Sequence, residues 1–276
     1  MEKKRLLFVT QEMEPYTEGN FISYLVARLP KLLHDNGFEL RILMPRYGIV
    51  NERRHRLHEV VRLSGMNIIV DDDDYPLIIK VASLPNSRLQ VYFLDNEDFF
   101  RRRFLFEDEK GMPFEDNPDR AAFFCKGALE TVKKFGWPPD IILCHGWLSG
   151  LIPLYVRKAY QMEPLFMHST VVFCAYDTPH ERLNAEHFLK KAAINNIQRA
   201  DLEPYLSEEG AVSMHKGAFY YADAVVLAEA GVQAEAERTE LIARKPVLTW
   251  RSEENGNMFE GLLNFLRQLT TVEEVS

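Results

Sequence analysis

The sequence predicts an α/β protein with a doubly wound, mostly parallel sheet, and two observations support this prediction. Apolar runs of strand length recur along the 276 residues and alternate with segments whose apolar residues repeat at helical spacing. Several runs are apolar at consecutive positions, which is typical of strands covered by helices on both faces. We therefore expect one Rossmann-like domain with right-handed connections.

Eight apolar runs are the strand candidates. Each has four to six residues, which is an ordinary strand length. They cover residues 6–9, 40–44, 77–81, 89–94, 141–144, 171–174, 224–227 and 246–249.

The helix candidates lie between these runs and end at recognisable stop signals, such as Gly37 and Gly136. They cover residues 21–33, 120–135, 150–160, 185–198, 211–221, 233–243 and 258–269. We expect residues 1–250 to form the domain, and residues 251–276 to add the last helix. That helix is amphipathic, and it should pack back on the domain through Phe259, Leu262, Leu263 and Leu266.

Two stretches, 49–74 and 96–117, interrupt the alternation of strands and helices. The first ends in the run Asp71–Asp74, which we interpret as a hairpin tip, because contiguous carboxylates point in different directions and make a poor metal site. The second contains Phe99, Phe100 and Phe104 among arginines. These aromatic rings either pin the excursion to the sheet or contact an anion or a sugar, and the sequence leaves both interpretations open.

Composition excludes several classes of protein. The net charge of −8 and the pI near 5.6 argue against nonspecific nucleic-acid binding. The apolar runs are too short to span a membrane or to form the core of a signal peptide, so neither is expected. The three cysteines, Cys125, Cys144 and Cys174, show no C-x-x-C spacing, which favours buried thiols and a reducing cytoplasm.

Six sequence blocks resemble the N-terminal half of bacterial glycogen synthases and plant starch synthases, glycosyltransferase family 5. They are R-L-L-F-V-T-Q-E-M-E-P-Y from Arg5, G-F-E-L-R-I-L-M-P-R-Y-G from Gly37, V-Y-F-L-D from Val91, D-N-P-D-R-A-A-F-F from Asp116, G-W-P-P-D-I-I-L-C-H-G-W from Gly136 and M-H-K-G-A-F-Y-Y-A-D-A-V from Met214. The blocks follow the order of the family and span about 220 residues.

This resemblance implies one half of a GT-B fold, in which two Rossmann-like domains face each other across a cleft. In the family, the N-terminal domain mainly holds the growing α-1,4-glucan and the C-terminal domain mainly holds the sugar nucleotide. The matching blocks belong to the N-terminal domain, and the second, nucleotide-binding domain has no counterpart in the 276 residues. We therefore expect no cofactor and no nucleotide site.

Three departures from the family pattern fall at positions that resemble its active site. Where the family has K-T-G-G-L, this chain has Glu18 in place of the lysine and Phe21 in place of a glycine. Leu148 stands where the family motif H-D-W-H-T-G has its second histidine, and Ala175 stands where T-I-H-N has its histidine. The acid and the bulky ring would repel a phosphate, and both histidines are replaced, so we predict no catalytic residues. His180, Glu186 and His187 do not form an H-E-x-x-H array, so we also predict no metal ligands.

The candidate binding residues follow strands, at the edge where ligands bind in open α/β sheets. They are Tyr16, Asn20, His145, Trp147, Tyr176 and Asp177. Aromatic rings with a few amide, imidazole and carboxylate groups suit a neutral sugar such as a glucan. The alternative for Tyr16 and Trp147 is packing of strand–helix corners, and the alternative for His145 is ordering of a loop.

Three functions are compatible with these features. We favour a non-catalytic homologue that binds α-glucan, or a protein partner that covers the cleft face, and self-association is a further option. The alternative is an active synthase subunit that transfers glucose from ADP-glucose or UDP-glucose with a partner chain supplying the nucleotide-binding half. An α/β protein that reuses the fold for other chemistry is the third.

Overall fold

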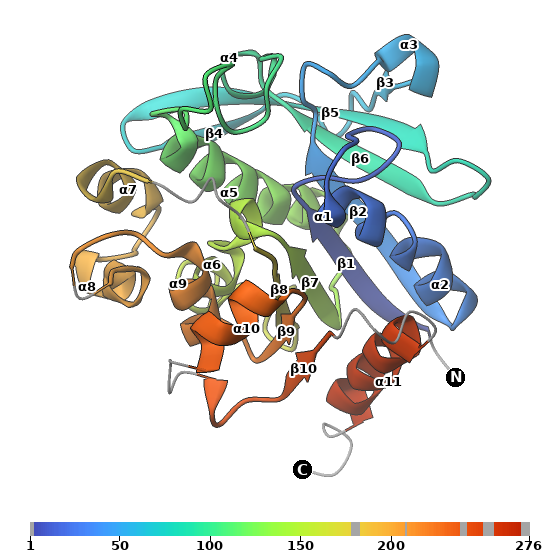
Figure 1. Ribbon diagram of the computed structural model, residues 1–276. Helices are drawn as coiled ribbons and strands as arrows, with labels where there is room; N and C mark the ends of the chain where they lie inside the picture. Colours follow the sequence, from blue (N-terminus) through green and yellow to red (C-terminus); the bar gives the residue numbers. More distant parts are fainter. Residues whose placement is uncertain (1–2, 178–182, 208, 238–241, 251–256, 272–276) are drawn as a thin grey trace.

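A ten-stranded mixed sheet runs through the computed structural model, which describes residues 3–177, 183–207, 209–237, 242–250 and 257–271 (Figure 1). All eight predicted strands are present. The strands are β1 (Lys4–Thr10), β2 (Phe38–Pro45), β3 (His58–Glu59), β4 (Met66–Val70), β5 (Asp73–Ser83), β6 (Gln90–Asp95), β7 (Ile141–His145), β8 (Thr170–Ala175), β9 (Ala224–Leu227) and β10 (Val247–Thr249).

The strand order is β10-β9-β8-β7-β1-β2-β6-β5-β3, with β4 paired to β5. The pairs from β10 to β6 are parallel, and β5 pairs antiparallel with β6, β3 and β4. The prediction of a mostly parallel α/β sheet is confirmed. The chain winds outward in both directions from β1 and β7, so the loops after these strands lie at the switch point where such sheets bind ligands.

Helices cover both faces of the sheet (Figure 1). One face carries α5, α6 and α9, with α6 in contact with both α5 and α9. The other face carries α2, which contacts β2. The helices are α1 (Phe21–Val26), α2 (Leu29–Asp35), α3 (Glu52–His55), α4 (Glu97–Phe100), α5 (Asn117–Phe135), α6 (Ile152–Arg157), α7 (Ala185–Ala192), α8 (Arg199–Leu202), α9 (Met214–Tyr221), α10 (Ala230–Glu237) and α11 (Asn257–Thr271), with 3-10 turns at Trp147–Ser149 and Glu203–Tyr205.

Several predicted helices are shorter than the apolar spacing indicated. The predicted helix 21–33 is wrong as one element, because it breaks into α1 and α2 just before Pro30. The proline ring has no N–H to donate and clashes with the carbonyl four residues earlier, so the chain restarts there. The predicted helix 185–198 ends at Ala192, and Asn195 adopts a φ of 51° that no α-helix contains.

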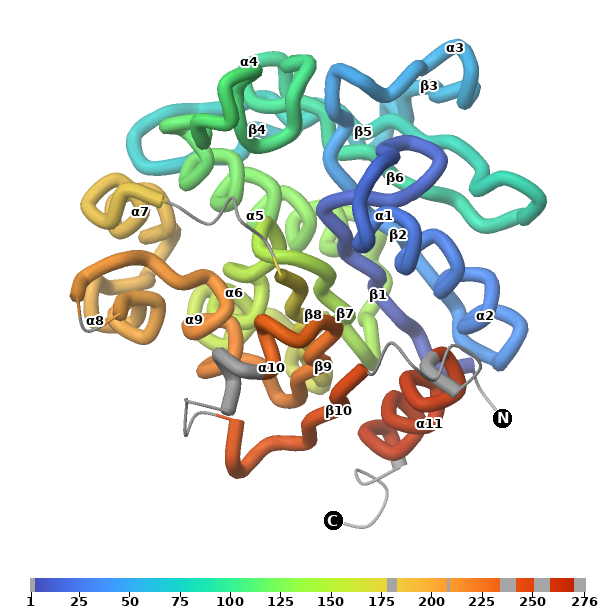
Figure 2. The backbone as a smooth tube through the Cα atoms, in the orientation of Figure 1, coloured from blue at the N-terminus to red at the C-terminus, as the bar shows by residue number. Residues whose placement is uncertain are grey.

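The helix α11 returns to the domain after β10. It contacts α2 and β10, and Figure 2 shows its red tube beside the blue tube of α2. Leu262 and Leu266 are fully buried and Leu263 is nearly so, while Phe259 is half-buried against the core. This packing follows from the amphipathic pattern of the helix.

The first excursion adds β3 and β4 to the sheet, whereas the second contains α4 and a loop with one isolated bridge, between Glu107 and Pro113. The prediction of a hairpin at the aspartate run is confirmed, since β4 and β5 pair on either side of Asp71. That carboxylate is not simply solvated, because it lies 2.8 Å from Nζ of Lys190 and 3.3 Å from Nζ of Lys191 on α7. In the second excursion Phe99 and Phe100 are buried, whereas Phe104 remains 38% exposed.

Candidate functional site

A cavity of about 390 Å³ lies at the carboxyl edge of the sheet. Its walls come from the loop after β1, from the residues that follow β8 and β9, and from the segment 104–107. We call it the edge cavity. It is lined by Gln11, Glu12, Glu18, Gly19, Asn20, Phe21, Ile22, Phe104, Leu105, Phe106, Glu107, Asp177 and Glu229.

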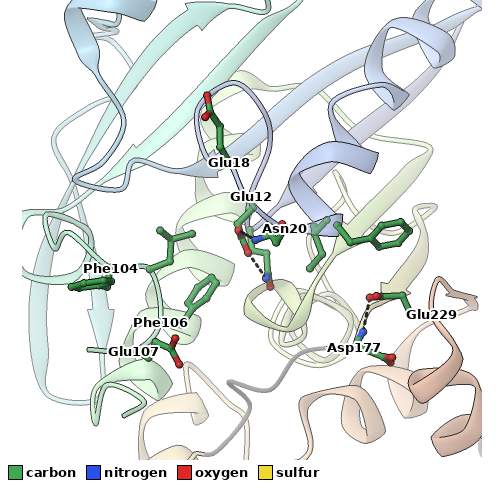
Figure 3. Close-up of a pocket in the computed structure, with 13 residues that line it drawn as sticks. Glu12, Glu18, Asn20, Phe104, Phe106, Glu107, Asp177 and Glu229 are labelled. Atoms are coloured by element: carbon green, nitrogen blue, oxygen red, sulfur yellow. Dashed lines mark hydrogen bonds between the residues drawn. The ribbon is translucent and has the colours of Figure 1, made fainter. Parts of the chain in front are cut away.

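Among the described residues that line the edge cavity, the charged side chains are all carboxylates. Five carboxylates line it, and no lysine, arginine or histidine is among the lining residues, all of which the structure describes. Figure 3 shows Phe106 and Glu107 on one side, Asp177 and Glu229 on another, and Glu12 with Asn20 between them. Such a site attracts cations and repels phosphate.

The wall after β1 is held by side-chain amides. Asn20 caps α1, because its Oδ1 accepts a hydrogen bond from the Ser23 N–H at 2.8 Å. Its Nδ2 donates to the carboxylate of Glu12, which also accepts from Gln11 Nε2 at 3.0 Å. Glu12 is 3% exposed, so these amides fix a nearly buried carboxylate at the floor of the cavity.

The opposite wall is held by a helix N-terminus. The carboxylate of Asp177 accepts hydrogen bonds from the N–H groups of Gly231 and Val232 at 3.0 and 2.6 Å, at the start of α10. The Asp177 N–H in turn donates to Glu229 at 2.9 Å. Burial raises the pKa of the Glu229 carboxyl, and the hydrogen bond from the Asp177 N–H offsets part of this rise. The helix N-terminus therefore already carries an anion of the protein itself.

The structure separates the six predicted binding residues into two groups. Asn20 and Asp177 line the edge cavity. Tyr16 is 3% exposed, and His145, Trp147 and Tyr176 are completely buried. The four predicted aromatic residues therefore do not form a stacking platform at the surface. Contact with a glucan stays a prediction, and Asn20 and Asp177 are the two of the six predicted residues that line the edge cavity.

Each buried ring has a packing role that its position after a strand does not reveal. Tyr16 donates through its hydroxyl to the Ser83 carbonyl at 3.2 Å, and burial raises its pKa to about 12. His145 Nδ1 lies 2.7 Å from the Tyr176 hydroxyl. Trp147 packs edge-on against Phe106, with ring centroids 5.0 Å apart. This is the corner-packing alternative.

The positions that depart from the family pattern lie in different places. Glu18 and Phe21 line the edge cavity, as a replaced phosphate-contacting loop would. Leu148 and Ala175 are fully buried, and the Leu148 N–H donates to Gln11 Oε1 at 3.2 Å. Gly146 takes the place of the aspartate in H-D-W-H-T-G; it has a φ of 83°, and a Cβ there would lie 2.2 Å from Gln11 Oε1. The substitution Gly146→Asp alone would therefore clash with the Gln11 side chain.

Sequence reasoning missed most of the cavity wall. Glu12 and Glu229 follow β1 and β9 at the same edge as Asp177, so their positions after apolar runs were an available signal. Phe106 and Glu107 come from the second excursion, whose fold the sequence did not predict. Within the described residues, no group of three or more His, Cys, Asp or Glu side chains is arranged to hold a metal ion.

The buried His145 makes stability sensitive to acid. Burial lowers its pKa from the usual 6.5 to about 3. Between these values the unfolded chain binds a proton that the folded protein does not, so stability is lost as pH falls below 6.5. We expect His145 to contribute a loss of about 2 kcal/mol between pH 7 and pH 5. Urea denaturation of the native protein and His145→Gln at both pH values measures it.

The matched control is His168→Gln, because His168 is exposed. The decisive quantity is the change in unfolding free energy between the two pH values, since His145→Gln also loses the hydrogen bond to Tyr176 at any pH. An equal acid loss in the native protein and in His145→Gln would contradict the assignment.

Comparisons with known proteins agree with this fold. The family model for the starch synthase catalytic domain matches residues 5–244. A glycogen synthase from Chlorobaculum tepidum is 36% identical over 222 residues, which cover 80% of this chain and 45% of that protein. One from Chlorobium limicola is 38% identical over 174 residues, 63% of this chain and 36% of that protein.

The structure of this chain is also similar to that of a starch synthase. The catalytic domain of starch synthase IV from Arabidopsis thaliana, solved bound to ADP and acarbose, superposes with a TM-score of 0.74 at 18% identity, over 90% of this chain and 52% of that one. The fold thus corresponds to about half of that GT-B glycosyltransferase. The chain belongs to the starch synthase catalytic domain family, which confirms the resemblance. It spans 36–45% of the length of the glycogen synthases compared.

No helix in the described ranges is both long enough and apolar enough to cross a lipid bilayer.

Proposed function

We propose that this chain is a non-catalytic member of its family. It uses the carboxyl edge of the sheet to bind an α-glucan or a protein partner, and it does not transfer glucose. The observation that carries the proposal is the lining of the edge cavity, with five carboxylates and no cationic side chain among residues that are all described. Transfer from a nucleotide sugar needs positive charge or free backbone N–H groups at the leaving diphosphate. The edge cavity would repel that group.

The helix N-termini at the edge cavity also argue against binding of a diphosphate there. A phosphate can bind at a helix N-terminus. At α10 that position is taken by the Asp177 carboxylate, and a Cβ on Gly231 would lie 2.6 Å from its oxygens, so the two are closely fitted. At α1 the capping position is taken by Asn20. Neither terminus at the cavity offers a vacant anion site.

A second candidate is an active synthase whose nucleotide-binding half is a separate polypeptide. The observation behind it is the family membership of the chain, which matches glycogen synthases over 36–45% of their length. The partner would then have to supply every cation at the leaving diphosphate. Under this alternative, activity would appear on adding that partner and not on mutating this chain.

We expect the purified chain to incorporate no glucose into glycogen from ADP-glucose or UDP-glucose, and calorimetry to detect no ADP-glucose binding. The Chlorobaculum tepidum glycogen synthase, assayed in parallel, is the positive control. Glu18→Lys should not restore transfer, because the other four carboxylates remain in the cavity. Saturable binding of ADP-glucose by the native chain would overturn the proposal.

Titration with maltooligosaccharides tests whether the edge cavity binds an α-glucan. We expect any binding to be weak and to respond to Asn20→Ala more than to changes at the buried rings. Asn20→Ser keeps an oxygen that can cap the helix without placing a second carboxylate beside Glu12, and serves as the control.

A further inference from the structure

A completely buried cation lies behind the wall of the edge cavity. Arg120, near the start of α5, donates from Nε to the Phe99 carbonyl at 2.9 Å and from Nη1 to Asn117 Oδ1 at 2.8 Å. Its Nη2 has no acceptor among the described residues. The Asp116 carboxylate is engaged by Arg102 instead, at 2.6 and 2.5 Å. Burial lowers the pKa of Arg120 to about 10, so the guanidinium is still charged at neutral pH.

A second unpartnered donor lies close to this guanidinium. Tyr47 follows β2 at the same edge of the sheet, and its side chain is completely buried. Within the described part of the chain its hydroxyl has no hydrogen-bond partner. Burial raises the pKa of Tyr47 well above its ordinary value, so the phenol keeps its proton and can donate it. Two buried donors without acceptors in one region are unusual in native proteins and need a physical explanation.

The ring of Phe106 lies between these two donors and the edge cavity. Its centroid is 5.9 Å from that of the Tyr47 ring and 5.8 Å from Arg120 Cζ. Phe106 also lines the cavity, where Figure 3 shows its ring in the wall. Its carbonyl accepts hydrogen bonds from the Phe114 N–H at 3.0 Å and from Asn117 Nδ2 at 2.8 Å. The backbone is thus held, and rotation of the side chain is the movement that would join the donors to the cavity.

We propose that Phe106 is a gate, and that Arg120 and Tyr47 form a concealed extension of the edge cavity that binds the oxygen atoms of a neutral ligand. With the ring rotated away, Nη2 and the phenol hydroxyl would both face the cavity as donors. The hydroxyl and ether oxygens of an α-glucan accept such hydrogen bonds. The inference rests on the proposed glucan binding, and it names how access to that site is controlled.

The chemistry of the two donors and of the cavity selects a neutral occupant. A cationic ligand has no acceptor to offer and would meet the Arg120 charge. An anion would have to pass a described lining whose charged side chains, such as the exposed Glu18, are all carboxylates. A neutral polyol avoids both penalties and supplies acceptors for both donors.

Titration of the full chain with maltooligosaccharides by calorimetry tests the gate. In the native chain the ring must rotate before the donors are reached, and an open state populated at about 10% weakens the apparent affinity about tenfold. Phe106→Ala removes the ring, and we expect the affinity to rise roughly threefold to tenfold.

Phe100→Ala is the matched control. This ring is completely buried against the same two side chains, with its centroid 5.7 Å from that of Tyr47 and 5.4 Å from Arg120 Cζ, but it does not line the cavity. Its removal should leave the affinity within about twofold of the native value. An equal gain in Phe100→Ala would show that any loosening of this core helps binding, and would overturn the gate.

Two double variants connect the gain to the donors. In the Phe106→Ala background, Arg120→Met keeps much of the side-chain length without a donor and should cancel the gain. Tyr47→Phe keeps the ring and removes the hydroxyl alone, so it folds with little risk and should cancel part of the gain. Circular dichroism confirms that each variant is folded. A gain that persists in both double variants would mean that the cavity is only enlarged, and would overturn the role of the donors.

Inorganic phosphate is the second probe. Saturable phosphate binding by Phe106→Ala that disappears with Arg120→Met would assign the extension to anions and overturn the neutral occupant. Glucan binding by the native chain without a gain in Phe106→Ala would refute the gate and leave the proposed function intact. If neither protein bound glucan, the gate and glucan binding would both be refuted, whereas binding of a protein partner would not. Transfer of glucose by the native chain would refute the proposed function alone.

Discussion

Trp147→Ala is expected to lower the free energy of unfolding by about 3–5 kcal/mol and to leave any sugar binding unchanged in the molecules that still fold. Trp147 is completely buried, and it packs against Phe106 under the wall of the edge cavity. Its removal leaves a void that the surrounding core fills only in part. Urea denaturation followed by far-UV circular dichroism measures the loss.

Trp147→Phe is the matched variant. No described group accepts a hydrogen bond from the indole Nε1, so phenylalanine removes an unsatisfied donor together with part of the ring. We expect a loss of only about 1–2 kcal/mol. If Trp147→Ala kept its stability but abolished maltooligosaccharide binding, Trp147 would be a ligand contact and the packing interpretation would be wrong.

The strands could be predicted because burial on both faces leaves a direct trace in the sequence. Runs such as Ile141–His145 are fully buried along their whole length. The missed strand β4 alternates exposed and buried residues and contains Asn67, so it carries less apolar signal than a central strand. Helix ends were less predictable, since apolar spacing continues across Pro30 while the backbone does not.

The sheet edge that carries the cavity was predictable, but the accessibility of its side chains was not. Asn20 and Asp177, which line the cavity, could be selected because they follow parallel strands, whose carboxyl ends share one edge. That argument says nothing about which side chains are covered. Phe106, from a different part of the chain, packs against Trp147, and this contact between distant segments has no local signature in the sequence. The acidic character of the described cavity lining likewise emerged only when four segments came together: the loop after β1, the 104–107 segment, and the residues after β8 and β9.

Two helical glycines, Gly217 and Gly261, differ in how much space a methyl group would find. Gly217 lies in α9, where a Cβ would lie 2.2 Å from ring atoms of Tyr205. That ring is completely buried, and its hydroxyl donates to the Gly150 carbonyl at 2.9 Å, so it has little freedom to move. Gly261 lies in α11, and the nearest atom to a Cβ there is Leu248 Cδ1 at 4.0 Å.

Gly217→Ala is therefore expected to lower the free energy of unfolding by about 2–3 kcal/mol, because overpacking against Tyr205 outweighs the better helix propensity of alanine. Gly261→Ala makes the same chemical change in a helix with room for the methyl group, and should raise stability by about 0.5–1 kcal/mol. Urea denaturation of both variants measures the opposite signs. A stabilising effect at both positions would mean that Tyr205 yields easily, and that the contact between α9 and the 3-10 turn at Glu203–Tyr205 does not hold the ring in place.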